Sequence, residues 1–422
     1  MTVVPGLVER TRCRLCQSDL LTQVLSLGDH YLHECRRPDE PKPEYSAPLT
    51  LVLCQDCKLL QLKHTVPPDY LFREYFYESG VNATMRKALA EVAGQAERWP
   101  LPADPLVCDI GSNDSTLLRS YNLRNAKKIG FEPAKNLAEK AKIDDGIIVD
   151  DYFSAQKFRE HFPRRNADIV TSCAVFYDLD DPILFANDVS DILSKKGVWV
   201  VQMNYHPFML WNNCFDNIGH EHLIYPGLRV FERILQQART DMYVQNVEFN
   251  DVNGGSIRLY VTKEGYPSSS IVAARQMEDT LGLEEISTYV QFANRVTEIR
   301  RQIRSIIQKA NDERKSVMAY GASTRGSTTL QYCGIDNTAI EAIAERNPSK
   351  WGLITSGTHI PIISEEEARG RKPDYLLVLP WQFKKEFVQR EAGYLKGGGK
   401  MIFPLPWPAV VGGGGGGGAT SQ

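Results

Sequence analysis

Apolar runs alternate with helix-like stretches along residues 81–265 of this 422-residue chain. The runs that read as buried strands are LVCDIG, KKIGFEP, GIIVDDYF, ADIVTSCAVF and GVWVVQM. Short, continuous apolar strands separated by helices are typical of a parallel sheet with helices on both faces. The pattern therefore predicts an α/β fold for this middle part of the chain.

A second, shorter stretch of the same kind covers residues 307–410. There SVMAYGAS, AIEAIAER, DYLLVLP and GGKMIFPLP read as strands, which predicts a smaller parallel sheet. Between the two stretches, apolar residues recur every three or four positions from Ile286 to Ile306, which predicts a long helix within a helical connection over residues 266–306. The glycine run near the end predicts a disordered tail over residues 411–422.

Charge and hydropathy exclude several classes of protein. The 49 Lys and Arg residues nearly balance 52 Asp and Glu residues, and the net charge of -3 argues against a nucleic-acid partner. No run of about 18 apolar residues suggests a membrane span, and the first residues lack the apolar core of a secretory signal. With nine cysteines, we therefore expect a cytoplasmic protein with reduced thiols or a metal and no membrane partner.

Two C-x-x-C pairs mark the turn-rich N-terminal region, residues 1–80. Cys13 and Cys16 form the first pair, and Cys54 and Cys57 form the second. Two residues between cysteines let both thiolates reach one metal, and four thiolates complete a tetrahedral site that suits zinc. Because no position stays open for water, this zinc would be structural. Unliganded thiols and a redox pair are the alternatives.

The first strand of the middle domain ends in a polar turn with a glycine, Gly111. A glycine lets a ligand approach the backbone closely. Glu132 ends the second strand about twenty residues later, where a carboxylate can accept hydrogen bonds from ribose hydroxyls. The G-x-G-x-x-G turn that binds a pyrophosphate is absent, so the pattern indicates S-adenosylmethionine rather than NAD. An ordinary tight turn is the alternative. An acidic residue and an aromatic ring after the third strand could contact the adenine. The candidate cofactor residues are Asp109, Gly111, Ser112, Asn113, Asp114, Glu132, Asp151 and Phe153.

Two histidines flank a glutamate in the segment after the fifth strand. His220, Glu221 and His222 stand together, although the chain has only eight histidines. Histidine is well suited to act as a base near neutral pH, and a nearby carboxylate can raise its basicity. The segment is therefore a candidate catalytic site. Metal binding by the two histidines and a purely structural pair are the alternatives.

These motifs resemble those of the sugar C-methyltransferases that act on nucleotide-linked 4-keto-deoxysugars. The resemblance covers residues 11–407 and rests on the two C-x-x-C pairs and on DIGSND, FEP, FDNIGHEHLIYP, NGGSIR, AYGASTRGST, QYCGI, RNPSK, GTHIPI and VLPWQFK. It implies a zinc-binding N-terminal domain, a class I, Rossmann-like methyltransferase domain that binds S-adenosylmethionine, and a smaller, Rossmann-like C-terminal domain that binds the nucleotide sugar. It also implies an enzyme that methylates a carbon beside the ketone of a TDP- or GDP-linked 4-keto-6-deoxysugar.

The resemblance also assigns roles to residues. His222 is the implied general base, with Glu221 supporting it and His220 in the same segment, while Gly219 stands where the family usually has a tyrosine. Cys173, Ala174 and Asp178 stand where family members often have asparagines and a histidine. The implied substrate-binding residues are Tyr75, Tyr77, Ser323, Arg325, Arg346 and His359.

The polar turn that contains Arg325 also suits phosphate, because backbone N–H groups at a helix start attract anions and arginine can add a bidentate contact. Two other functions stay open at this point. One is an O- or N-methyltransferase of the same fold, and the other is a non-catalytic protein that binds a nucleotide sugar.

Overall fold

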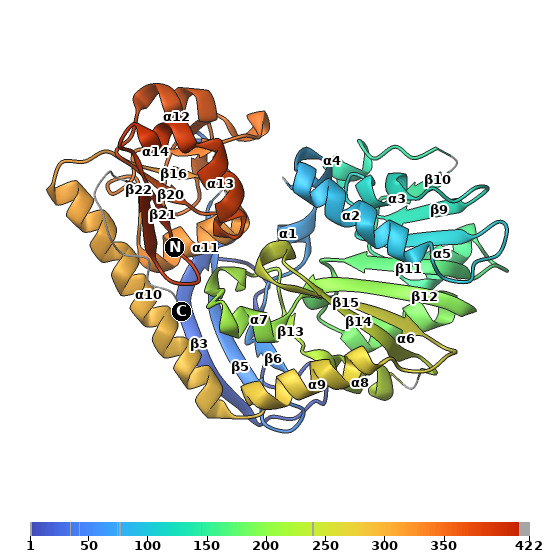
Figure 1. Ribbon diagram of the computed structural model, residues 1–422. Coiled ribbons are helices and arrows are strands. Elements are labelled where there is room, and N and C mark those ends of the chain that lie inside the picture. The colour runs from blue at the N-terminus through green and yellow to red at the C-terminus, as the bar shows by residue number, and fades with distance from the viewer. Residues whose placement is uncertain are drawn as a thin grey trace.

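The chain folds around three β-sheets that lie next to one another. The computed structural model describes residues 2–412 except 34, 42, 74, 76, 145 and 239. In Figure 1 a seven-stranded sheet lies on the right, a six-stranded sheet lies at the upper left, and N-terminal strands lie below and between them. Among the described residues, no helix is both long enough and apolar enough to cross a bilayer.

The central sheet has the strand order β10-β9-β8-β11-β12-β15-β14. Its strands are β8 (Leu106–Ile110), β9 (Lys127–Phe131), β10 (Gly146–Val149), β11 (Ala167–Cys173), β12 (Leu193–Asn204), β14 (Tyr243–Asn250) and β15 (Ser256–Thr262). The strands β8 to β12 are parallel, while β15 is antiparallel to both of its neighbours. The order reverses between β8 and β11, and open α/β sheets bind ligands at such a switch point. This is the strand order of the class I methyltransferase fold, so the predicted fold class is confirmed.

Alternate residues of the central strands face helices on opposite sides of the sheet. Val200 of β12 belongs to the core beneath α2 (Ala83–Ala96), and Trp199 belongs to the core beneath α6 (Pro182–Ile192). The other helices on this sheet are α3 (Thr116–Ser120), α4 (Lys135–Ala138), α5 (Ala155–His161) and α8 (Leu228–Gln237). Because both faces are covered, the central strands are mostly apolar and could be recognised as short runs.

The N-terminal strands form a smaller sheet in the order β1-β5-β6-β13, with β3 paired to β5. Its strands are β1 (Thr2–Val3), β3 (Leu21–Tyr31), β5 (Tyr45–Cys54), β6 (Leu60–Leu62) and β13 (Ile224–Tyr225), and the pair beside it is β2 (Val8–Glu9) and β7 (His64–Thr65). The strand β13 follows the H-E-H segment directly. The N-terminal sheet therefore holds that segment in place, and Leu62 N–H adds a hydrogen bond to the Leu223 carbonyl over 2.9 Å.

The C-terminal sheet has the order β19-β17-β16-β20-β21-β22, in which β22 is antiparallel to β21 and the other pairs are parallel. Its strands are β16 (Val317–Tyr320), β17 (Ile343–Glu345), β19 (Ile362–Ser364), β20 (Tyr375–Val378), β21 (Lys400–Phe403) and β22 (Ala409–Gly412). Its helices are α11 (Thr324–Cys333), α12 (Glu365–Arg371), α13 (Lys384–Arg390) and α14 (Ala392–Lys396). The apolar pattern predicts four of these strands but neither β19 nor β22. Val411 and Gly412, which were expected in the tail, belong to β22, and tail residues 413–422 lie outside the described residues.

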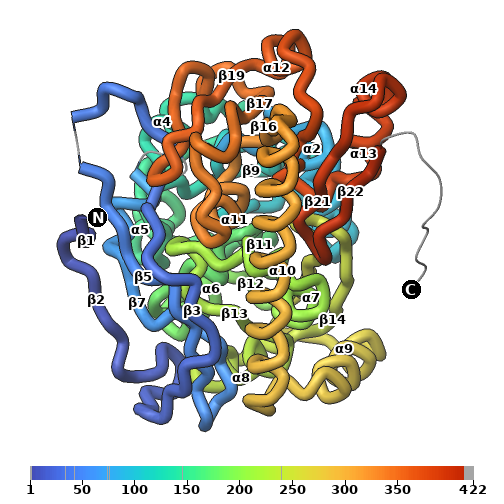
Figure 2. Tube along the Cα trace, turned by 90° about the vertical axis from the view of Figure 1, so that its left-hand side faces the viewer, coloured from blue at the N-terminus to red at the C-terminus, as the bar shows by residue number. Residues whose placement is uncertain are grey.

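The long helix α10 (Ile286–Asp312) follows α9 (Ser269–Leu281) and continues six residues beyond the predicted Ile306. Its buried face includes Tyr289, Phe292, Val296, Ile299, Ile303, Ile307 and Ala310. Figure 2 shows α10 running along the molecule beside β3 and α11, which it contacts. A short ladder between β4 (Cys35–Arg36) and β18 (Ile354–Thr355) also joins the N-terminal region to the C-terminal sheet.

Candidate active site

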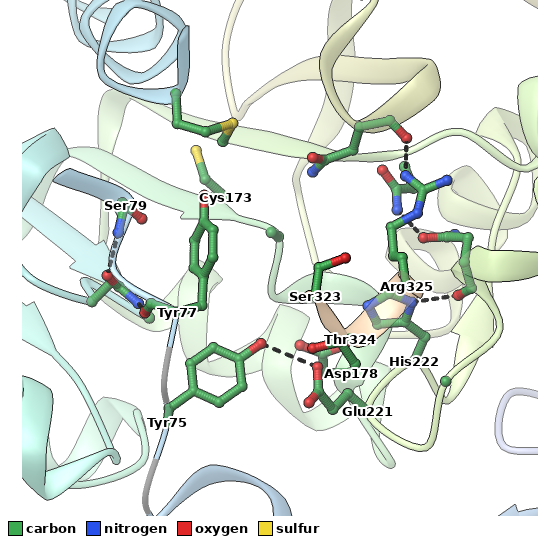
Figure 3. Close-up of a pocket in the computed structure, with 18 of the residues that line it drawn as sticks. Tyr75, Tyr77, Ser79, Cys173, Asp178, Glu221, His222, Ser323, Thr324 and Arg325 are labelled. Carbon is green, nitrogen blue, oxygen red and sulfur yellow. Dashed lines mark hydrogen bonds between the residues drawn. The ribbon is translucent and has the colours of Figure 1, made fainter. Parts of the chain in front are cut away.

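A cavity of about 700 Å³ lies between the three sheets. Its walls come from the carboxyl ends of the central strands, from N-terminal residues between 65 and 82, and from the carboxyl ends of β16 and β17. Ligand pockets usually measure roughly 300–1,000 Å³. The switch point of the central sheet opens into this cavity, which is therefore the candidate site (Figure 3).

The turn after β8 borders the cavity and packs closely against Val175. Gly111 has a φ of +70°, and a Cβ there would lie 2.5 Å from Val175 Cγ2, so a side chain does not fit. The Glu132 carboxylate lines the cavity and accepts hydrogen bonds from the N–H groups of Asn113 and Ala134 over 2.7 and 2.8 Å. A carboxylate has about four acceptor positions, so two remain for ribose hydroxyls. This end of the cavity therefore fits the adenosine of S-adenosylmethionine.

Four of the eight predicted cofactor residues line the cavity, namely Gly111, Asn113, Glu132 and Phe153. The other four are Asp109, Ser112, Asp114 and Asp151. Asp109 is 2% exposed and accepts a hydrogen bond from Thr171 Oγ1 over 2.5 Å, and burial raises its pKa to about 7. The Ser112 hydroxyl is buried, and Asp151 pairs with Lys157 over 2.6 Å. None of these four residues lines the cavity, and their contact with the cofactor stays a prediction.

The side chains that follow Gly111 hold an earlier segment over the cavity. Asn113 Oδ1 accepts a hydrogen bond from Ser79 N–H over 3.0 Å, and Asn113 Nδ2 donates to the Tyr77 carbonyl over 3.0 Å. Asp114 Oδ2 accepts from Gly80 N–H over 2.8 Å. The Asp114 carboxylate is thus taken up by a backbone N–H group, and it positions the segment that carries Tyr77.

His222 lines the same cavity with an uncharged ring. Its Nδ1–H donates to the Asn217 carbonyl over 2.6 Å, and Tyr177 packs edge-on against the ring with the centroids 4.3 Å apart. Burial lowers the pKa of His222 to about 4, so the ring is neutral near pH 7. Within the described part of the chain Nε2 makes no hydrogen bond, so its lone pair is available as a base.

Glu221 does not orient His222, which corrects that part of the prediction. The hydrogen-bond partner of His222 is the Asn217 carbonyl, whereas Glu221 Oε2 accepts a hydrogen bond from the Tyr75 hydroxyl over 3.1 Å. Figure 3 shows Tyr75 reaching Glu221 along one wall of the cavity. Asp178 lines this wall too, and the sequence analysis gave it no role.

His220 anchors the segment to the N-terminal sheet. Its ring is 7% exposed, and Nε2 bonds to the Ala47 carbonyl on β5 over 2.9 Å. Burial lowers its pKa to about 4. The preceding residue, Gly219, lines the cavity, and an added Cβ would meet no atom within 4 Å, so the position of the family tyrosine is open space.

The C-terminal sheet repeats the arrangement around Glu132. Glu345 ends β17, lines the cavity and accepts hydrogen bonds from the N–H groups of Ala322 and Asn347 over 2.7 and 2.8 Å. Lys350 is 7% exposed and donates to the Ala322 carbonyl over 2.9 Å. Glu345 was not predicted from the sequence, although it is also an acidic residue at the end of a second strand, 23 positions after a glycine-bearing turn.

Arg325 binds protein groups, which corrects its expected role as a free phosphate ligand. Its guanidinium forms two hydrogen bonds with the Asp216 carboxylate, over 3.0 and 2.7 Å, and donates to the Asn253 carbonyl. Trp381 Nε1–H also donates to Asp216, over 2.9 Å. Arg325 therefore joins α11 to the segment that carries Asn217, the partner of His222.

Five of the six predicted substrate residues line the cavity, namely Tyr75, Tyr77, Ser323, Arg325 and Arg346. Ser323 is the N-cap residue of α11, and its hydroxyl accepts a hydrogen bond from Gly326 N–H over 3.1 Å. Arg346 is half exposed and lies 3.6 Å from Glu365. His359 does not line the cavity, because it pairs with Glu44 over 3.1 Å on an exposed turn, and this corrects its assignment.

The four cysteines of the N-terminal region meet at one point. Their sulfurs all lie within 4.8 Å of one another, with 3.5 Å between Cys13 and Cys57 and 3.5 Å between Cys16 and Cys54. Zinc–sulfur bonds of about 2.3 Å in a tetrahedron place sulfurs about 3.8 Å apart. Gln61 Nε2 also donates to Cys13 Sγ over 3.2 Å, which supports a thiolate. The cluster therefore fits a closed zinc site.

Two family models match the chain. Residues 251–406 match the model described as "C-methyltransferase C-terminal domain", and residues 13–72 match the model described as "Putative zinc binding domain". Among characterised proteins, the chain is similar to the C-methyltransferase NovU of Streptomyces niveus. The two are 32% identical over 407 residues, which cover 94% of this chain and 96% of NovU.

Solved structures give more distant likenesses. The plantazolicin methyltransferase BpumL in complex with SAH is 13% identical, covers 42% of this chain and 84% of its own length, and has a TM-score of 0.34. An S-adenosylmethionine-dependent methyltransferase from Clostridium acetobutylicum is 12% identical, covers 43% of this chain and 92% of its own length, and has a TM-score of 0.30.

Proposed function

The chain belongs to the sugar C-methyltransferase family, and from this premise we propose that its substrate is a nucleotide-linked 4-keto-6-deoxysugar, methylated at a carbon beside the ketone. The observation that carries the proposal is a neutral His222 with a free Nε2, in a cavity that both Glu132 and Glu345 line. Each carboxylate ends a second strand beside a glycine-bearing turn. The cavity thus has acceptors for two nucleosides and a base.

One of the two nucleosides belongs to S-adenosylmethionine, which supplies an electrophilic methyl group when it is bound. Glu132 would accept the ribose hydroxyls, and the backbone at Gly111, which lines the cavity, would face the amino-acid end. Phe153 packs edge-on against Phe131, with 5.2 Å between the ring centroids, and offers an apolar contact for the adenine.

The other nucleoside belongs to the TDP or GDP of the sugar. Glu345 would accept the ribose hydroxyls, and the turn before α11 would face the diphosphate. Arg346 is the arginine of this region that has an exposed guanidinium, because Arg325 is held by Asp216. The sugar would then extend toward His222.

His222 would take the proton from the carbon beside the ketone. The pair of electrons from the C–H bond delocalises onto the ketone oxygen and makes the carbon nucleophilic. The Asn217 carbonyl holds Nδ1–H and so presents Nε2 to the substrate. Negative charge that develops on the substrate favours protonation of the ring, although burial alone disfavours it. Because both reactants share one cavity, proximity contributes much of the acceleration.

Exchange of the substrate proton with solvent tests this proposal. In deuterated water without S-adenosylmethionine, the protein should incorporate one deuterium beside the ketone of a TDP- or GDP-linked 4-keto-6-deoxyhexose, as measured by mass spectrometry. His222→Ala should slow the exchange by about 100- to 10,000-fold. Methylation without exchange, and with no effect of His222→Ala, would instead support an O- or N-methyltransferase.

A further inference from the structure

Asp178 has an unsatisfied carboxyl group beside the reaction site. It ends the short helical turn η2 (Phe176–Asp178), directly after β11, and it lines the cavity. Its Oδ1 is buried and has no hydrogen-bond partner among the described residues. A buried polar oxygen without a partner is costly in a folded protein. Such a group at an active site calls for a functional explanation.

The surroundings of Asp178 favour its protonated form. Burial and the nearby Glu221 carboxylate raise the pKa of Asp178 well above its ordinary value. A protonated carboxyl group is a hydrogen-bond donor, whereas a carboxylate is an acceptor only. Burial and Glu221 therefore favour the form of Asp178 that carries an O–H donor.

The turn that carries Asp178 also contacts the base. Its neighbour Tyr177 packs against the ring of His222, so one short segment orients the base and presents the acid. Figure 3 shows Asp178 next to Glu221, whose carboxylate acts on the pKa of Asp178.

Two other cavity donors are already engaged. The Tyr75 hydroxyl donates to Glu221, and Arg325 donates to Asp216 and Asn253. Asp178 differs from both, because its buried Oδ1 has no hydrogen-bond partner in the described part of the chain.

We propose that Asp178 is a catalytic acid that hydrogen-bonds the ketone oxygen of the substrate and stabilises the enolate. This assignment rests on the proposed function. When His222 takes the proton, the C–H electron pair forms a C=C bond and the C=O π pair moves to oxygen. Asp178 keeps its proton and shares it with that oxygen. The C=O bond forms again as the enolate carbon takes the methyl group, the S–CH3 bond breaks with its electron pair left on sulfur to give SAH, and the proton on His222 leaves to water.

Two substitutions separate donation from packing. Asp178→Leu removes the donor, whereas Asp178→Asn keeps the shape and an N–H donor. Solvent deuterium exchange into the 4-keto-6-deoxyhexose should slow by about 100- to 1,000-fold in Asp178→Leu, the usual effect of losing one donor to an oxyanion. Asp178→Asn should stay within about tenfold of the wild-type rate. Both variants should bind free TDP or GDP as the wild type does, which shows that they are folded.

The outcomes are distinct. Equal exchange rates in Asp178→Leu and the wild type would overturn the assignment, and so would an Asp178→Asn rate as low as that of Asp178→Leu. If the wild-type protein itself exchanges no proton, the proposed function fails and the assignment falls with it.

Discussion

Arg14 Nε donates a hydrogen bond to Asp180 Oδ1 over 3.0 Å. Arg14 lies between Cys13 and Cys16, and its guanidinium is enclosed by protein. Asp180 lines the cavity two residues after Asp178. The zinc-binding turn is therefore joined directly to the wall of the reaction site.

Replacing Arg14 should damage the site without releasing the metal. In Arg14→Met, the loop after β11 loses a charged partner, and Gln61 and Thr65 lose hydrogen bonds of 3.2 and 2.7 Å. We expect the free energy of unfolding to fall by about 1–3 kcal/mol and methylation to slow, while zinc content stays at one ion per chain. Denaturant unfolding, turnover and metal analysis check this.

Arg12→Met is the matched control for that experiment. Arg12 is exposed and donates to the Gln17 carbonyl, away from Asp180. It should behave as the wild type. An Arg14→Met protein with unchanged stability and turnover would show that the zinc-binding turn does not support the cavity wall.

Substitution of Glu132 and of Glu345 should each weaken the binding of a different nucleoside. Each carboxylate accepts two backbone N–H groups, and the amide of glutamine would turn an N–H donor toward one of them. We expect Glu132→Gln to weaken SAH binding by about 10- to 100-fold and to leave TDP or GDP binding unchanged. Glu345→Gln should have the reverse effect. Calorimetric titration with each ligand tests both, and equal losses for both ligands in one variant would contradict the division.

Acid should destabilise the fold through its buried histidines. Burial lowers the pKa of His220 to about 4, so the unfolded chain takes up a proton below about pH 6.5 that the folded chain cannot accept until about pH 4. Stability is therefore complete above pH 6.5 and falls as the pH decreases to 4, by up to about 3 kcal/mol for His220. Burial shifts the pKa of His30 and His206 in the same direction.

The substitution His220→Gln isolates the contribution of His220 to this loss of stability, because the glutamine amide can still donate to the Ala47 carbonyl. Urea unfolding should show His220→Gln losing about 3 kcal/mol less than the wild type between pH 6.5 and 4. His161 is exposed on α5, so His161→Gln should follow the wild-type curve. Parallel curves for His220→Gln and the wild type would exclude His220 as a source of the acid sensitivity.

The predictable parts of the fold are those with local signals. The strands β8 and β11 at the centre of the sheet are buried and stand out as apolar runs, and α10 has a regular apolar period. The strand β13 has two residues, and its pairing with β6 depends on where an N-terminal sheet comes to lie. No local pattern indicates such a partner.

In the candidate site, too, only the residues with a local sequence pattern could be predicted. Glu345 could have been found from the rule that found Glu132, because both are acidic residues at the end of a second strand. The partner of His222 could not, since Asn217 contributes a backbone carbonyl whose direction depends on the loop conformation. Likewise, Asp114 is the kind of residue that contacts a ligand, but its carboxylate accepts a hydrogen bond from a backbone N–H group 34 residues earlier in the chain.

Gly80 should not tolerate a methyl group. A Cβ there would lie 2.4 Å from Asp114 Oδ2 and 3.0 Å from Thr116 Oγ1. The Asp114 carboxylate would have to move and give up the hydrogen bond from Gly80 N–H, and the neighbouring bond from Ser79 N–H to Asn113 would be disturbed. Because these bonds hold the segment with Tyr77 over the cavity, Gly80→Ala should raise the KM for both substrates by about tenfold and destabilise the fold by about 1–3 kcal/mol.

Gly94→Ala provides a control in which the stability should change in the opposite direction. Gly94 is exposed within α2, and a Cβ there would meet no atom within 4 Å. Alanine favours a helix interior over glycine by about 0.8–1 kcal/mol, so this variant should be slightly more stable than the wild type and equally active. Thermal unfolding and initial rates measure both variants. If Gly80→Ala kept wild-type KM values, the turn after β8 would not position Tyr77, and the expected contact between that segment and the substrate would lose its structural basis.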